Sequence, residues 1–185
     1  MFRYGSTLLT LSLASLLTAC GGSDDSSSQD ATTGNRTRLA DCIDTDLLKQ
    51  QMLDEVNAAR SQARTCGKYG DFPATSAITW DDVLRQAADG HSQDMAKVNF
   101  FSHTGSSGST LGDRVKAVGY SYSLVGENLA AGQTSTKSAV NGWIGSEGHC
   151  KNLMTADFTE IGAACAYSDS ADYKRYWTLV LGKPR

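Results

Sequence analysis

The sequence predicts an α+β fold in which helices pack on an antiparallel sheet. Two observations carry this prediction. Helical spacing of apolar residues dominates residues 45–146, and the apolar stretches from Phe158 onward are short and rich in β-forming residues. Helices followed by strands along a chain are typical of α+β domains. The 185 residues, 40% hydrophobic and 20% charged, have the ordinary composition of one folded domain.

The first 20 residues are set aside from the fold because they have the pattern of an export signal. "MFRYGSTLLTLSLASLLTAC" carries one positive charge, Arg3, and an apolar run at 8–17 that is too short to span a bilayer. Its end, "LTAC", looks like a bacterial lipobox, whose cysteine receives a diacylglycerol. A plain secretory signal with a chance cysteine is the alternative. We expect residues 1–19 to be a lipoprotein signal peptide and Cys20 to carry the lipid.

The mature chain would then hang from a membrane by acyl chains on Cys20 without spanning that membrane. Residues 21–38 contain no large apolar side chain, so we expect residues 20–40 to be a flexible tether. Gly21 follows the anchor cysteine with no aspartate to signal inner-membrane retention. The predicted location is therefore the bacterial cell envelope, facing outside the cytoplasm, with the outer membrane favoured in a cell with two membranes.

The charge pattern argues against nucleic acid as a partner. Removing residues 1–19 takes away Arg3 and no acid, so the formal net charge moves from −3 to −4. The remaining chain is mildly acidic and contains no basic run. Nucleic-acid-binding domains carry clustered positive charge, which this chain lacks.

Four cysteines remain after Cys20, and an even number in an exported domain predicts two disulfides. They are Cys42, Cys66, Cys150 and Cys165. Three pairings exist. The favoured one joins sequence neighbours, Cys42–Cys66 and Cys150–Cys165, and each bond would stabilise the fold by about 3 kcal/mol through loop entropy. A structural zinc site of four thiolates is the alternative, but no C-x-x-C pair is present.

The predicted elements follow one another from Thr45, which can cap the first helix. Helices are predicted at 45–63, 80–98, 111–120 and 134–146. Strands are predicted at 158–168 and 175–183, with a further strand around 120–131. Segments rich in Gly and Ser separate them.

The chain has three histidines, and they fall into two groups. His91 lies on the apolar stripe of the helix predicted at 80–98, so we interpret it as a core histidine. His103 and His149 lie at predicted helix exits, where side chains can point into a cleft. Glu127, in "VGENLAAG", is by itself either a surface acid or a buried and paired one.

Five stretches occur in one order: "FFSHTGSSGSTLGDR", "GYSYSLVGENLAAG", "WIGSEGHCKNLM", "FTEIGAACA" and "YWTLVLG". This order resembles the CAP superfamily of cysteine-rich secretory proteins, antigen 5 and pathogenesis-related 1 proteins, and in particular its bacterial SCP-like extracellular lipoproteins. The resemblance covers roughly residues 45–182. It implies that residues 41–185 form one CAP (SCP-like) domain, a three-layer α-β-α sandwich with a central antiparallel sheet.

The resemblance also implies a central cleft lined by two histidines and two acids. His103 matches the histidine of the "FSH" motif, Glu127 matches the acid of "GEN", and His149 matches the histidine of "GH". In many relatives a glutamate three residues after the tryptophan is the fourth group, whereas Glu147 is four residues after Trp143. Glu147 either supplies the fourth group or points outward.

Two imidazoles and one or two carboxylates can hold a divalent ion, zinc above all, with water completing the coordination. The predicted metal ligands are therefore His103, Glu127, Glu147 and His149. Glu147 and His149 are two residues apart on an expected turn, so they do not form the i, i+4 pair of a zincin. Without metal, the same groups would brace loops through histidine–carboxylate hydrogen bonds.

Three functions remain open, and a binding function is favoured over an enzymatic one. The first is a lipid-anchored binding protein whose cleft holds a divalent metal, a small polar ligand, or a lipid or sterol of the kind that some superfamily members bind. The second is a metal-assisted hydrolase of peptides or cell-wall material, with His103, Glu127 and His149 as catalytic candidates. There His103 would act as base and Glu127 would orient it. The third is a structural or interaction domain.

Overall fold

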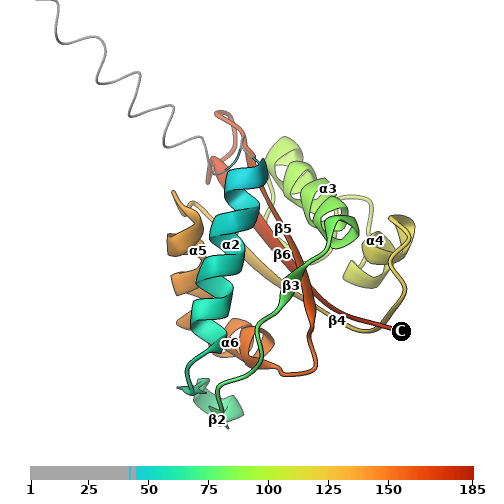
Figure 1. Ribbon diagram of the computed structural model, residues 1–185. Coiled ribbons are helices and arrows are strands. Elements are labelled where there is room, and N and C mark those ends of the chain that lie inside the picture. Colours follow the sequence, from blue (N-terminus) through green and yellow to red (C-terminus); the bar gives the residue numbers. More distant parts are fainter. Residues whose placement is uncertain (1–41, 43–44) are drawn as a thin grey trace, which may run out of the picture.

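The computed structural model describes residue 42 and residues 45–185, which form three layers (Figure 1). The predicted signal peptide and tether lie outside the described residues. A four-stranded sheet in the order β3-β5-β6-β4 is the middle layer. Helices α2, α5 and α6 pack on one face, and α3 and α4 pack on the other. The predicted α+β class and three-layer sandwich are confirmed.

Strand β6 (Arg175–Pro184) is central to the sheet, and both β4 (Tyr122–Ala131) and β5 (Glu160–Tyr167) pair with it in antiparallel fashion. The short β3 (Thr79–Trp80) adds in parallel to β5. The predicted antiparallel sheet is therefore correct except at this edge. A small hairpin, β1 (Arg64–Thr65) and β2 (Asp71–Phe72), encloses the 3-10 helix η1 (Gly67–Tyr69).

The side chains of β6 explain why both faces of the sheet are covered. Trp177 and Leu179 belong to the core cluster under α2 and α5, whereas Val180 packs with α3 and α4. All three are at most 1% exposed. Because successive strand side chains point to opposite faces, a strand that is apolar at consecutive positions requires helices on both sides.

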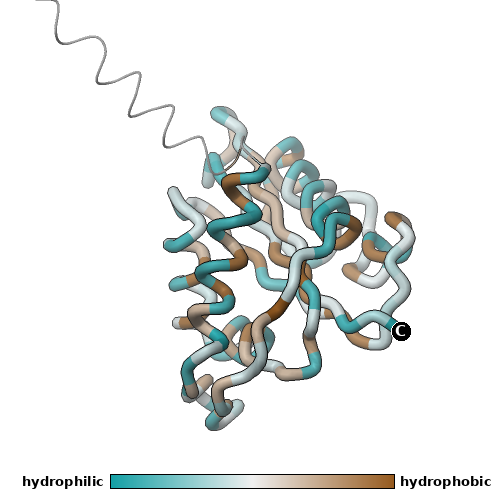
Figure 2. Tube along the Cα trace, viewed as in Figure 1, coloured by the Kyte–Doolittle hydropathy of each residue, from teal (hydrophilic) through white to brown (hydrophobic). Residues whose placement is uncertain are grey.

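Within residues 45–185, five helices surround the sheet: α2 (Thr45–Arg60), α3 (Asp82–Val98), α4 (Leu111–Ala117), α5 (Thr136–Ile144) and α6 (Glu147–Met154). Each buries an apolar stripe, and Figure 2 shows hydrophobic and hydrophilic positions alternating along α2. The first four were predicted. Helix α6 was expected to be a turn, and that prediction is wrong. Gly145 ends α5, and Cys150, Leu153 and Met154 then bury one side of a new helix.

Arg60 fastens the end of α2 to the segment that follows α6. The side chain is 1% exposed, and burial lowers its pKa. Its Nε donates to Ser76 O at 2.9 Å, Nη1 to Leu153 O at 2.7 Å and Nη2 to Phe158 O at 3.1 Å. A buried cation is tolerated only when its donors are hydrogen-bonded, so these carbonyls offset its desolvation.

The predicted disulfide pairing is wrong, although all four cysteines are bonded. The bonds join Cys42 to Cys165 and Cys66 to Cys150. Helix α2 separates Cys42 from Cys66, and its 16 residues rise about 24 Å along the helix axis. A disulfide requires Cα atoms within about 7 Å, so these two cannot meet. The observed Cα–Cα distances are 4.6 Å and 5.5 Å.

Peptide mapping without reduction is therefore expected to recover the Cys42–Cys165 and Cys66–Cys150 peptides. Replacing both Cys42 and Cys165 by alanine should lower the free energy of unfolding by about 5 kcal/mol through loop entropy, since 123 positions separate them. Guanidinium denaturation measures this loss. The matched double variant of Cys66 and Cys150, 84 positions apart, should lose slightly less. A recovered Cys42–Cys66 peptide would contradict the pairing.

Candidate functional site: a histidine–acid cleft at the sheet edge

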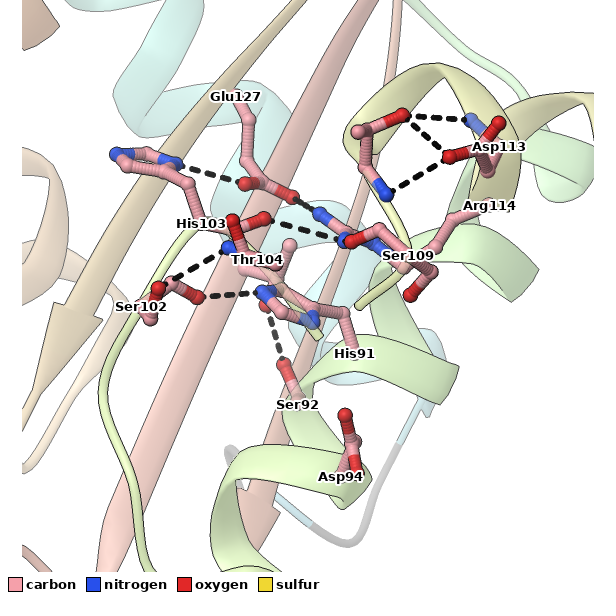
Figure 3. Close-up of polar contacts among 12 residues, drawn as sticks. His91, Ser92, Asp94, Ser102, His103, Thr104, Ser109, Asp113, Arg114 and Glu127 are labelled. Carbon is pink, nitrogen blue, oxygen red and sulfur yellow. Dashed lines mark hydrogen bonds and ion pairs between the residues drawn. The ribbon is translucent and has the colours of Figure 1, made fainter. Parts of the chain in front are cut away.

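The site is organised around the buried carboxylate of Glu127 in strand β4 (Figure 3). Its side chain is 3% exposed. Oε1 accepts a hydrogen bond from His103 Nδ1 at 2.8 Å, and Oε2 accepts one from Arg114 Nη2 at 2.6 Å. Both carboxylate oxygens are therefore engaged, one by an imidazole and one by a guanidinium.

Arg114 is the functional residue that sequence reasoning missed. It lies on α4, whose first turn is fixed by a capping box between Thr110 and Asp113. Its Nη1 donates to His103 O at 3.2 Å and to Ser109 O at 3.0 Å. Arg114 thus holds both the acid and the backbone that carries the histidine. The available signal was the acid itself, because a carboxylate buried in an apolar strand requires a cationic partner.

His103 has a fixed tautomer. A carboxylate only accepts hydrogen bonds, so Nδ1 carries the hydrogen shared with Glu127, and the lone pair of the neutral ring lies on Nε2. The side chain is 61% exposed, and Figure 3 shows its second ring nitrogen directed away from Glu127. The imidazole therefore presents a basic nitrogen to the open side of the site.

His149 lies beside this pair, but within helix α6 rather than at a helix exit as predicted. Asn128 Nδ2 donates to His149 O at 3.1 Å. Asn152 Nδ2 donates to Asn128 Oδ1 at 2.9 Å and to Glu127 O at 3.2 Å. These hydrogen bonds attach helix α6, which carries His149, to the two residues of β4 that include Glu127. Burial lowers the pKa of His149, and the nearby charge of His103 lowers it further.

Glu147 points outward, so it does not supply the fourth group. Its Oε1 accepts from Lys68 N at 3.3 Å, Oε2 lies 3.8 Å from Lys68 Nζ, and its side chain is 51% exposed. Residues two apart on a helix lie about 200° apart around its axis and do not share a face. Because His149 faces the cleft, Glu147 on the same helix faces the η1 loop instead.

The predicted four-ligand zinc site does not fit this arrangement. In the described part of the chain, no group of three or more His, Cys, Asp or Glu side chains is arranged to hold a metal ion. The Glu127 oxygens already bind His103 and Arg114, and Glu147 lies elsewhere. Of the four predicted ligands, only the imidazole rings of His103 and His149 remain available to a metal ion. No step is therefore derived through a metal.

A cavity of about 290 Å³ adjoins His149, and most of its wall is apolar. Phe101, Leu129, Trp143 and Tyr173 line it. Phe101 and Tyr173 are 46% and 51% exposed, and their ring centroids lie 6.0 Å apart. Two exposed aromatic rings at the mouth of a cavity offer apolar contact area to a ligand whose polar group reaches the histidines.

His91 is a core histidine, as interpreted from the sequence. It is 1% exposed, and its Nε2 lies 2.9 Å from Ser102 O, a carbonyl that can only accept. Nε2 therefore carries the hydrogen. Burial lowers the pKa of His91, so the ring is neutral. Through this bond α3 holds the residue immediately before His103.

The fold is that of the class that the sequence motifs predicted. The profile of the cysteine-rich secretory protein family, CAP, matches residues 53–181, and the chain belongs to this family. The match covers well over half of the chain and includes all four residues predicted for the cleft.

Three relatives are informative. A Bacillus subtilis protein described as the uncharacterized membrane protein YlbC is 34% identical over 114 residues, which are 62% of this chain and 30% of that protein. The crystal structure of an extracellular SCP-domain protein from Bacillus anthracis is 32% identical, with a TM-score of 0.61, over 75% of this chain and 41% of that one. An outer surface protein of Borrelia burgdorferi shares the fold. It is 21% identical, with a TM-score of 0.60, and the match covers 78% of this chain and 98% of that one.

The chain spans about a third of the length of YlbC, so the likeness concerns the CAP domain rather than that whole protein. None of the helices in the described residues combines the length and the apolar character needed to cross a bilayer.

The closeness of the two histidines predicts a titration result. The His149 pKa is lowered first by burial and second by the charge of His103. In an NMR titration, His149 should gain its proton below about pH 6.5, the ordinary histidine value. In His103→Ala its midpoint should rise but stay below that value, because burial persists. The control Ser107→Ala, in the loop after His103, should leave the midpoint unchanged. An unchanged His149 midpoint in His103→Ala would show that the charge of His103 does not act on His149.

Proposed function

We propose that the protein is an extracytoplasmic, lipid-anchored binding protein whose cleft takes a small amphipathic ligand. The observation that carries the proposal is the largely apolar cavity that ends at His149. The ligand's apolar part would pack between Phe101, Trp143 and Tyr173. Its polar group would reach the two imidazoles, which the Glu127–Arg114 pair holds in place.

The proposed location rests on the sequence and on the relatives. "LTAC" supports a lipid on Cys20 and a place in the bacterial cell envelope, with the outer membrane favoured in a cell with two membranes. The relatives include an extracellular protein, an outer surface protein and a membrane protein. The ligand class fits this place, since amphipathic molecules gather at membrane surfaces. A lipid or sterol belongs to the class.

Tryptophan fluorescence tests the cleft, because the buried Trp143 lines the cavity. Decanoate and 1-decanol should each change the emission saturably at micromolar concentration. Gly142→Leu should weaken both at least ten-fold, because Gly142 lines the cavity and its added side chain would fill it. An added Cβ there meets only Gln133 Nε2, at 3.9 Å, so the backbone need not move.

Asn141→Leu is the matched control. Asn141 is exposed on the same helix, one position earlier, and does not line the cavity. It should bind both probes like the unaltered protein. Equal affinity in Gly142→Leu and Asn141→Leu, or no saturable change at all, would overturn the proposal.

Hydrolysis is a second candidate, favoured by the His103–Glu127 hydrogen bond. A general base needs a positioned nitrogen with a free lone pair, and an acid behind the ring supplies that orientation. His103 would then take a proton from water through Nε2. Zinc stays a prediction for the same cleft. Of its four predicted ligands, His103 and His149 are the two that remain, because Glu127 and Glu147 have other partners.

Casein and purified peptidoglycan test the hydrolytic candidate, each with and without chelator. Product should form and should be lost in His103→Ala, whereas Ser107→Ala should retain activity. Calorimetric titration with zinc chloride, run on the same variants, tests the metal. Absence of product from both substrates removes the enzymatic candidate, and zinc binding unchanged by His103→Ala removes this cleft as the metal site.

A further inference from the structure

A second and larger cavity, of about 460 Å³, lies between α3, α4 and the serine-rich loop that joins α3 to α4. It has no lining residue in common with the cavity beside His149. Its volume falls within the range of small-molecule sites, roughly 300–1,000 Å³. The proposed function makes no use of it.

Two buried polar atoms on residues lining this cavity have no hydrogen-bond partner among the described residues. They are His91 Nδ1 and Arg114 Nε. Figure 3 shows one nitrogen of the His91 ring on Ser102 and the other on a different side of the ring. Because Nε2 donates to Ser102 O, the neutral ring leaves Nδ1 as an acceptor. Arg114 Nε–H is a donor.

Buried polar atoms nearly always have partners, so an unpaired acceptor and an unpaired donor at one cavity indicate a missing group. A hydroxyl group both donates and accepts through a single oxygen atom. It can donate to His91 Nδ1 or accept from Arg114 Nε–H. A molecule with two or more hydroxyls can satisfy both atoms together.

The charges in the cavity favour a neutral occupant. The Arg114 guanidinium is already paired with Glu127 at 2.6 Å. Burial would raise the pKa of Asp94, but hydrogen bonds from the hydroxyl and backbone N–H of Ser106, at 2.5 Å and 2.8 Å, bring it below its ordinary value. Asp94 is therefore an anion that disfavours anionic ligands, and both of its oxygens are already hydrogen-bonded to Ser106. Arg114 is likewise paired with Glu127, so no unpaired charge is left for a charged ligand.

We propose that this cavity is a second binding site, which takes a small neutral polyhydroxylated molecule the size of a monosaccharide. His91 Nδ1 and Arg114 Nε bind its hydroxyls, and Ser107 and Ser109 are among the residues that line the same cavity. The site stands independently of the proposed function, since it uses a different cavity and a different ligand class.

A ligand bound in this second cavity would also affect the histidine–acid site, because Arg114 belongs to both. The same guanidinium that offers Nε to the second cavity holds Glu127 through Nη2 and His103 O through Nη1. A ligand that moves Arg114 therefore changes the partners of His103. This makes the Arg114 Nε–H resonance a direct reporter of binding.

NMR titration of the ¹⁵N-labelled domain tests the site, with D-glucose and N-acetyl-D-glucosamine as neutral probes. Both should shift the Arg114 Nε–H resonance and the amides of residues 86–94 and 106–118 saturably, at millimolar concentration. Gly90→Leu blocks the cavity. Gly90 lines it, an added Cβ would meet nothing within 4 Å, and replacing a glycine inside a helix favours the helix.

Gln93→Leu is the matched control, because Gln93 is exposed on the same helix and does not line the cavity. The shifts should disappear in Gly90→Leu and persist in Gln93→Leu. Three outcomes overturn the proposal: no saturable shift with either sugar, equal shifts in Gly90→Leu, or saturation only by charged probes such as inorganic phosphate or methylammonium chloride. The amide spectrum of Gly90→Leu, unchanged away from the cavity relative to that of Gln93→Leu, shows that the variant is folded without reference to ligand binding at the first cavity.

Discussion

The carboxylate of Glu127, shared between His103 and Arg114, is the interaction on which the rest of the site depends. A carboxylate at 3% exposure has lost most of its hydration, which costs several kcal/mol unless partners replace it. Here the guanidinium supplies the charge, and the imidazole supplies the second hydrogen bond. Leaving either charge unpaired costs about 3–5 kcal/mol. Glu127 is therefore a positioning residue that sets the tautomer of His103, and its oxygens are not free to coordinate an ion.

The position of this acid in the sheet explains how three separate segments meet. Strand β4 is an edge strand, where the sheet order ends, and its side chains are contacted from both helical layers. Arg114 reaches Glu127 from α4 in one layer, and α6 of the other layer is held to β4 through Asn128 and Asn152. The Cys66–Cys150 bond fixes the same helix one residue after His149. An edge that would otherwise be open to strand pairing is thus covered by the site.

What the sequence could predict follows from the range over which each signal acts. Helical stripes are local, so α2 and α3 and the buried place of His91 were predicted correctly. Pairings between distant segments are not local, and the cysteine pairing failed for that reason. The helix predicted after Thr45 nonetheless excludes the predicted pairing, because a helix between Cys42 and Cys66 holds these two cysteines too far apart for a disulfide. Helix α6 was missed because glycines at 145 and 148 resemble a turn, whereas buried Cys150 and Leu153 stabilise it.

The two cavities differ in chemistry, but a series of hydrogen-bonded side chains runs between them. Binding at one cavity can therefore be coupled to binding at the other. The cavity beside His149 is mostly apolar, while residues of the other, His91 and Arg114, carry polar atoms that find no partner in the part of the chain that the structure describes. From Arg114, hydrogen bonds of 2.6 Å and 2.8 Å lead through Glu127 to His103, whose charge acts on His149 in the wall of the first cavity. Coupling between sites is reciprocal, so a ligand that shifts Arg114 and alters binding at His103 must have its own affinity altered by the same factor when His103 is occupied. Because the Glu127 carboxylate joins the guanidinium to the imidazole ring, such coupling should weaken when that carboxylate is replaced, and the bond from Arg114 Nη1 to His103 O is then the remaining route between them.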